Sequence, residues 1–114
     1  MLRNQMVTVH HKRSAAVFRA IADPTRRNIL ALLRRRRRSV NEIAGNFSCS
    51  RPAISKHLRV LRAAGLVVTE REGTARICQL NAEPLRAVGT WLHDYELLWN
   101  ESLKSLKRYV EEES

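Results

Sequence analysis

The stretch from Ser39 to Gly65 reads SVNEIAGNFSCSRPAISKHLRVLRAAG, and its pattern decides how this sequence folds. Ser39 and Glu42 form a capping-box pattern, in which a hydroxyl and a carboxylate satisfy backbone N–H groups at a helix start. Ser50 can cap a second helix, because Pro52 then falls in the first turn, where a missing N–H does no harm. Gly65 is well placed to end that helix. The stretch therefore predicts two short helices joined by a tight turn.

The outward face of the second predicted helix carries only cationic and hydroxyl side chains. Its members are Arg51, Ser55, Lys56, Arg59 and Arg62. No acidic residue occurs from Arg51 to Val68, whereas a solvated helix normally mixes both signs. Such a surface suits phosphates and base edges, and a helix-turn-helix places the front half of its second helix in the major groove of DNA. The alternative is a basic surface helix in another kind of small helical bundle.

Two β-type runs follow this motif, at residues 66–71 and 75–80. They alternate as expected of strands with one covered face, and Gly73 between them supplies the backbone freedom that a hairpin turn needs. A helix-turn-helix followed directly by a hairpin is a winged helix, in which Arg71 and Arg76 would flank the tip of the wing. We therefore predict a mainly α fold with a small β-hairpin (α+β).

A helix and five consecutive arginines precede the motif. Asp23 can cap a helix that has Pro24 at its first position, and the apolar stripe of this helix would cover the helix-turn-helix. The run from Arg34 to Arg38 has three interpretations: a solvated helix end, a nuclear-localisation-like segment, and a grip on the DNA backbone. We favour a combination of the first and third, in which two of the five, Arg37 and Arg38, reach phosphates.

The last predicted element opens at Glu83-Pro84, and its apolar residues recur every three or four positions. They are Leu85, Val88, Leu92, Tyr95, Trp99, Leu103, Leu106 and Val110. This spacing predicts a long amphipathic C-terminal helix of roughly 26 residues, about 39 Å in length. A domain this small has too little surface to cover the stripe, so we expect a two-fold dimer in which a second copy buries it. The alternative is that the helix folds wholly onto its own domain.

The composition favours one domain with a polyanionic partner. The chain has 114 residues, and 21 lysines and arginines against 11 acids give a net charge of +10. No apolar run is long enough to span a membrane. We expect residues 1–12 to be a flexible tail without signal-peptide character, and 13–114 to be the domain. Cys49 and Cys78 are isolated, which is typical of a cytoplasmic protein without disulfides.

The order of the predicted elements resembles that of the ArsR/SmtB family of bacterial winged-helix repressors. The similar segments are FRAIADPTRRNIL (18–30), SRPAISKHLRVL (50–61) and AGLV (64–67). The resemblance implies a homodimer joined through the first and last helices, which binds operator DNA and usually represses nearby genes. It adds Val17, Phe18 and Ile21 to the predicted dimer interface.

The predicted DNA-contacting residues come from the motif, the wing and the arginine run. They are Arg37, Arg38, Ser39, Arg51, Pro52, Ser55, Lys56, His57, Arg59, Arg71 and Arg76. On the family pattern, Arg51, Ser55 and Lys56 match positions that face the groove. His57 has two interpretations: it contacts the groove, or it is a packed residue that bonds the neighbouring helix.

The metal ligands of the founding members of the family are missing from this sequence. Residues 40–45 read VNEIAG, without the cysteine pair found at that place in those members. His93 and Asp94 are adjacent, hence about 100° apart on a helix, and no second histidine completes a tetrahedral set. We therefore expect no metal and no other cofactor. A thiol switch at Cys49 or Cys78 is not favoured, and the sequence does not identify an effector.

Other functional classes fit the sequence less well. It lacks a glycine-rich phosphate loop, a nucleophile elbow and paired carboxylates, so we do not expect an enzyme. A winged-helix protein-interaction module and a nonspecific or architectural DNA-binding protein remain as alternatives, although a docking version would usually carry apolar anchors on the second helix. The prediction is a sequence-specific dimeric repressor that binds a palindromic operator in double-stranded DNA through the major groove.

Overall fold

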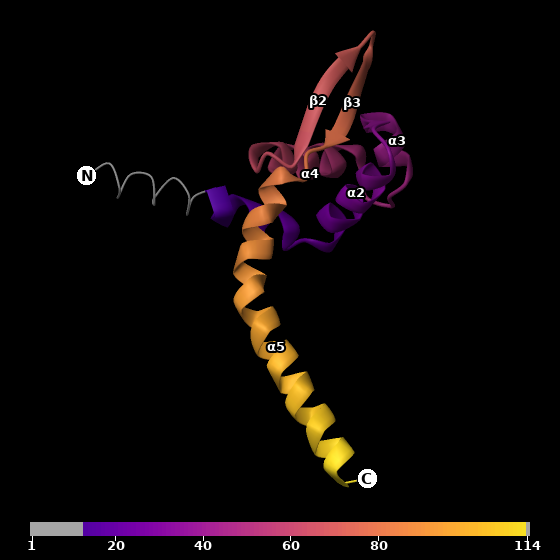
Figure 1. The fold of residues 1–114 in the computed structure, drawn as a ribbon. Helices are drawn as coiled ribbons and strands as arrows, with labels where there is room; N and C mark the ends of the chain where they lie inside the picture. The colour runs from indigo at the N-terminus through magenta and orange to yellow at the C-terminus, as the bar shows by residue number, and fades with distance from the viewer. Residues whose placement is uncertain (1–12, 114) are drawn as a thin grey trace, which may run out of the picture.

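A cluster of short helices lies at the centre of the fold, and a β-hairpin and one long helix project from it in opposite directions (Figure 1). The structure is a computed structural model that describes residues 13–113. The predicted tail, residues 1–12, lies outside the described residues. The elements in chain order are a helical segment at residues 13–21, then α2 (Pro24–Arg35), β1 (Arg38–Ser39), α3 (Val40–Gly45), α4 (Arg51–Ala63), β2 (Val67–Glu72), β3 (Ala75–Leu80), η1 (Glu83–Leu85) and α5 (Arg86–Glu113).

The predicted helix starts are confirmed by their hydrogen bonds. The Asp23 carboxylate accepts a bond of 3.0 Å from the backbone N–H of Arg26, with Pro24 in the first turn of α2. Ser39 and Glu42 form the complete capping box at the start of α3. The Ser50 hydroxyl accepts a bond of 3.3 Å from the backbone N–H of Ala53 in the first turn of α4. These local signals set the directions of the three helices.

One apolar core joins the helices and the base of the sheet. Ile29, Leu30 and Leu33 come from α2, Ile43 comes from α3, and Ile54, Leu58 and Leu61 come from α4; Val17, Ala20, Leu66, Val67 and Cys78 complete it. Because three residues of α4 face this core, the opposite side of α4 is left at the surface. Val17 is only 2% exposed within the protomer and packs in this core, and its place at a dimer interface stays a prediction.

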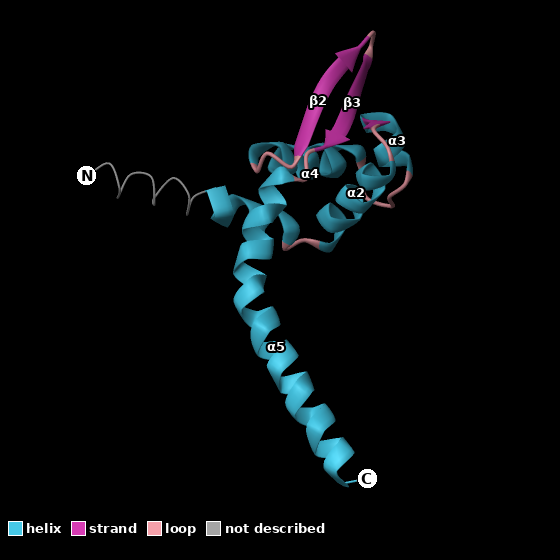
Figure 2. Ribbon diagram, viewed as in Figure 1, coloured by secondary structure: helices cyan, strands magenta, loops and turns pink. Residues whose placement is uncertain are grey.

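The sheet has three strands, whereas the sequence predicted a two-stranded hairpin (Figure 2). The strand order is β1-β3-β2 and both pairings are antiparallel. β1 pairs Arg38 with Cys78 and Ser39 with Ile77. Gly73 has a φ of 61°, which allows the tight turn between β2 and β3. The additional strand ties the entrance of α3 to the base of the wing.

α5 projects away from the rest of the fold (Figure 1). It is a single helix of 28 residues, and none of them is buried. Leu85, predicted as the first apolar residue of this helix, lies in the short 3₁₀ turn η1 that precedes it. No helix among residues 13–113 is long and apolar enough to cross a membrane.

Candidate nucleic-acid interface

α4, the start of α3 and the wing border one groove of about 250 Å³. Four residues of the predicted DNA-contacting set line it: Ser39, Arg51, Ser55 and Arg76. The structure adds Asn41, Arg62 and Thr74, which that set left out. The sequence could have placed Arg62 in this groove, because it lies seven residues after Ser55 and therefore on the same side of the helix. The groove joins three elements that are separate in sequence.

α4 presents positive charge without neutralising partners. Arg51 and Pro52 are exposed in its first turn, and Lys56 and Arg59 are exposed beside the groove without lining it. Among the residues described, neither Lys56 nor the guanidinium groups of Arg51 and Arg59 enter an ion pair or side-chain hydrogen bond. Unpaired cations on one helix face favour contact with a polyanion such as the DNA backbone.

The outer half of the wing adds two opposed cations. Arg71 and Arg76 are cross-strand partners in the register of β2 and β3. Like charges placed directly opposite each other on a sheet destabilise it. A phosphate near both side chains would relieve that repulsion, which supports the predicted role of the two residues in contacting DNA.

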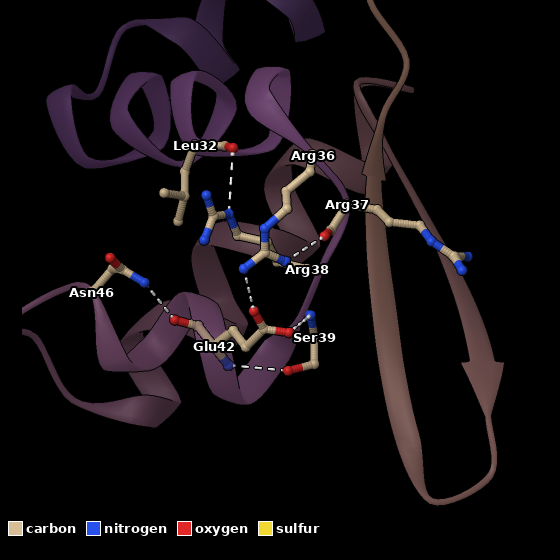
Figure 3. Close-up of polar contacts among 7 residues, drawn as sticks. All are labelled: Leu32, Arg36, Arg37, Arg38, Ser39, Glu42 and Asn46. Carbon is tan, nitrogen blue, oxygen red and sulfur yellow. Dashed lines mark hydrogen bonds and ion pairs between the residues drawn. The ribbon is translucent and has the colours of Figure 1, made fainter.

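The arginine run is largely engaged within the protein (Figure 3). Arg36 Nη2 donates to Glu42 Oε2 at 2.9 Å, and Arg38 Nε donates to the Leu32 carbonyl oxygen at 3.4 Å. Arg37 Nη1 lies 2.9 Å from Glu72 Oε1 on the wing, a pair that remains about half exposed. Exposed pairs of this kind contribute roughly 0–1 kcal/mol, so phosphate can replace Glu72 at small cost.

Within the run from Arg34 to Arg38, the two arginines with no described side-chain partner are Arg34 and Arg35, which lie exposed in the last turn of α2. The phosphate contacts of Arg37 and Arg38 stay a prediction; in the protomer the two side chains connect β1 to the wing and to α2. The helix-end interpretation therefore fits Arg34 and Arg35, since cations are favourable at a helix C-terminus.

Glu42 is held in its charged form at the edge of the interface. The hydrogen bond from the Arg36 side chain, followed by the one from the Ser39 backbone, lowers the pKa of this carboxyl below its ordinary value. The Ser39 backbone N–H lies 3.3 Å from Glu42 Oε1, and the Glu42 backbone N–H lies 3.1 Å from the Ser39 hydroxyl. Asn46 Nδ2 donates to the Glu42 carbonyl oxygen at 2.7 Å. These bonds fix the orientation of α3 beneath the groove (Figure 3).

His57 lies between α4 and α2, and it does not line the groove. Arg26 Nη1 is 3.3 Å from His57 Nδ1, so the ring nitrogen accepts this bond, and Asp23 Oδ2 is 3.9 Å from the same atom. Arg26 also donates from Nε to the Ala20 carbonyl oxygen at 2.7 Å. The backbone hydrogen bond from Arg26 is the main cause that lowers the pKa of Asp23. His57 therefore lies where a packed residue that bonds the neighbouring helix would lie, and it does not line the groove that it was predicted to contact.

Among the described residues, the cysteine and histidine side chains do not converge on a site. Burial raises the pKa of the Cys78 thiol, while Cys49 is half-buried in the turn between α3 and α4. Within residues 13–113 no group of three or more histidines, cysteines, aspartates or glutamates is placed to hold a metal ion. His93 is exposed on α5.

A helix-turn-helix with an attached wing and a cationic recognition helix, here α4, defines a winged-helix DNA-binding protein. Residues 23–69 match the family described as bacterial regulatory protein, arsR family. The HTH-type transcriptional regulator Rv2034 of Mycobacterium tuberculosis is 36% identical over 96 residues, which cover 84% of this chain and 87% of the relative. The transcriptional repressor SdpR of Bacillus subtilis is 38% identical over 79 residues, which cover 69% of this chain and 88% of SdpR.

A solved structure agrees with these relatives. The ArsR-like transcriptional regulator from Rhodococcus sp. RHA1 superposes with a TM-score of 0.66 and 32% identity, covering 86% of this chain and 92% of that one. The chain belongs to the ArsR family. It is a DNA-binding transcriptional regulator of the ArsR/SmtB type, which confirms the fold and the class predicted from the sequence.

Proposed function

We propose that this regulator is a homodimeric repressor that reads an inverted-repeat operator in the major groove. The observation that carries the proposal is the groove between α4 and the wing, which gathers Arg51, Ser55, Arg62 and Arg76 around one cavity. Polar side chains in the first turns of a recognition helix discriminate bases, and cations around them hold the flanking phosphates.

The proposed roles follow the position of each side chain. Arg51, Ser55 and Lys56, in the first half of α4, read or flank base edges. Arg59 on α4 and Arg71 and Arg76 on the wing hold phosphates, because Arg59 lies in the second half of α4 and the other two flank the tip of the wing. His57 acts indirectly, by fixing α4 against α2 through Arg26.

The dimer is proposed from the exposed apolar stripe of α5. Side chains at helical spacing along α5 are 52–66% exposed; they include Tyr95, Trp99, Leu103 and Leu106. Phe18 contacts Trp91 edge-to-face with ring centroids 5.5 Å apart, so the first helical segment and α5 present one continuous apolar surface. Ile21, Leu85, Val88 and Leu92 are only partly exposed at its inner end. A second copy would remove this surface from water.

Repression is proposed because relatives of similar sequence carry that role in their names. SdpR is a transcriptional repressor, and SmtB of Mycobacterium tuberculosis, 40% identical over 57 residues, is an HTH-type transcriptional repressor. A dimer seated on an operator that overlaps a promoter excludes the polymerase from it. A reporter gene under such an operator should be silenced by the intact regulator and released by the Arg51→Ala variant.

The deciding experiment is a selection from a random-sequence duplex pool at physiological salt. We expect enrichment of an inverted repeat whose half-sites lie about 10 base pairs apart, which matches one turn of DNA. Enrichment of a single unrepeated site would contradict the dimer. Binding without any enrichment, lost steadily as salt is raised, would contradict sequence-specific reading and favour a nonspecific DNA coat.

A further inference from the structure

A second cavity, of about 620 Å³, lies at the C-terminal end of α4. It is open to solvent and is lined by the helical segment at residues 13–21, the C-terminal end of α4, the connection after β3 and the start of α5. Its volume falls in the range of small-molecule sites, which is roughly 300–1,000 Å³. The DNA-contacting groove is a separate cavity on the other side of Arg62, and Arg62 lines both.

The lining of this rear cavity combines three cations with an apolar floor. Arg13, Arg62 and Arg86 reach it from three different elements, against a single acidic residue, Glu83. No ion pair or side-chain hydrogen bond engages the three guanidinium groups within the described part of the chain. Ala16 and Pro84 contribute to the apolar part of the lining. Three unpaired arginines around an apolar hollow match the chemistry of a ligand with one anionic end.

We infer that the rear cavity binds an amphiphilic carboxylate, such as a medium-chain fatty acid. The carboxylate would take paired N–H donors from the arginines, whose planar fork matches its two oxygens. The alkyl body would cover the alanine and proline surface. A phosphate dianion fits less well, because it has no alkyl body to cover the apolar part of the lining.

The shared arginine gives such a ligand a way to act on DNA binding, an effect that rests on the proposed function. When a carboxylate engages Arg62 in the rear cavity, that guanidinium is no longer available to the groove. The ligand also lies between α4, which reads DNA, and α5, which carries the dimer stripe. Ligand binding should therefore lower operator affinity, and operator binding should lower ligand affinity by the same factor.

The test begins without DNA, on the full chain. Octanoate is titrated into the protein by calorimetry and by amide chemical shifts in NMR, with octan-1-ol as the uncharged counterpart. We expect saturable octanoate binding, shifts concentrated at residues 62–65 and 81–87, and much weaker octanol binding. Arg86→Gln should weaken octanoate binding about tenfold, because a charge-assisted hydrogen bond is lost. Arg108→Gln, the same change far along α5, should leave it unchanged.

Three results would overturn the inference. Equal binding of octanoate and octanol would show that the arginines do not select a carboxylate. Shifts confined to residues 91–110 would place the ligand on the exposed stripe of α5. Loss of binding in Arg108→Gln as large as in Arg86→Gln would show a general charge effect. Melting curves of both variants confirm that each is folded.

The link to regulation is measured separately, by fluorescence anisotropy of the selected operator with and without octanoate. We expect octanoate to lower operator affinity in the wild-type protein and in Arg108→Gln, and to have little effect in Arg86→Gln. Unchanged operator affinity at saturating octanoate would overturn the regulatory part. Failure of the operator selection would contradict the proposed function, while the titration in the absence of DNA would still decide whether the cavity binds carboxylates.

Discussion

The exposed stripe of α5 gives a quantitative prediction for the dimer through Leu106. This side chain is 59% exposed in the protomer. Fully burying a leucine contributes about 1.5–3 kcal/mol, so covering the exposed part contributes roughly 1–2 kcal/mol in each protomer. A two-fold dimer counts the site twice. Leu106→Ala should therefore weaken dimerisation by roughly 2–4 kcal/mol, which raises the dissociation constant about 30- to 900-fold.

Leu97 supplies the matched control for this experiment. It is the same residue type, 53% exposed on the same helix, but nine residues before Leu106 and hence about half a turn away from the stripe. Sedimentation equilibrium over a range of concentrations should show Leu97→Ala to be as dimeric as the wild type. Equal weakening by both variants, or no weakening by Leu106→Ala, would refute the assignment of the stripe to the dimer.

Four further predictions concern the interface and its support. Arg51→Ala should cost about 1–3 kcal/mol at one base position, seen as relaxed preference there in a competition assay; an equal loss on all duplexes would contradict base reading. Arg76→Ala should weaken binding to all duplexes and reduce the slope of log K against log salt by about 0.9; an unchanged slope would contradict phosphate contact. Ser39→Ala should lower the free energy of unfolding by about 1 kcal/mol in urea titrations, because the α3 cap is lost, and an unchanged midpoint would argue against the cap. Because the pKa of Glu42 is lowered from 4.5 in the fold, its charged form stabilises the protein above that pH, and the contribution disappears as the pH falls through the lowered pKa. The stability difference between wild type and Glu42→Gln should accordingly shrink in acid. A difference that grew in acid would show that the charged Glu42 carboxylate does not stabilise the fold.

The parts of the fold that the sequence predicted are those with local signals. The caps at Asp23, Ser39 and Ser50 are confirmed because each depends on residues within one helical turn. The wing was predicted because its two strands are adjacent and joined at Gly73. The length of α5 was nearly right, since its apolar residues keep one period throughout.

The features that the sequence leaves open depend on contacts between distant segments. β1 has only two residues and lies in an arginine run without alternation, so only its pairing with β3 reveals it. Helical periodicity showed that Val17 is on an apolar face, but it cannot tell the protomer's own core from a partner. The Arg37–Glu72 pair joins residues 35 positions apart, and no spacing rule anticipates it. The rear cavity likewise depends on four segments meeting in space.

The length of α5 makes it a lever. Its 28 residues, at 1.5 Å each, span about 42 Å. If the helix moves as a rigid rod, a tilt of roughly 5° where it leaves the domain displaces its far end by roughly 3.7 Å over that length. In two copies joined along this rod, a tilt of that size at Arg86 would turn each winged-helix domain against the joined helices, which changes the angle at which the two copies of α4 meet the DNA.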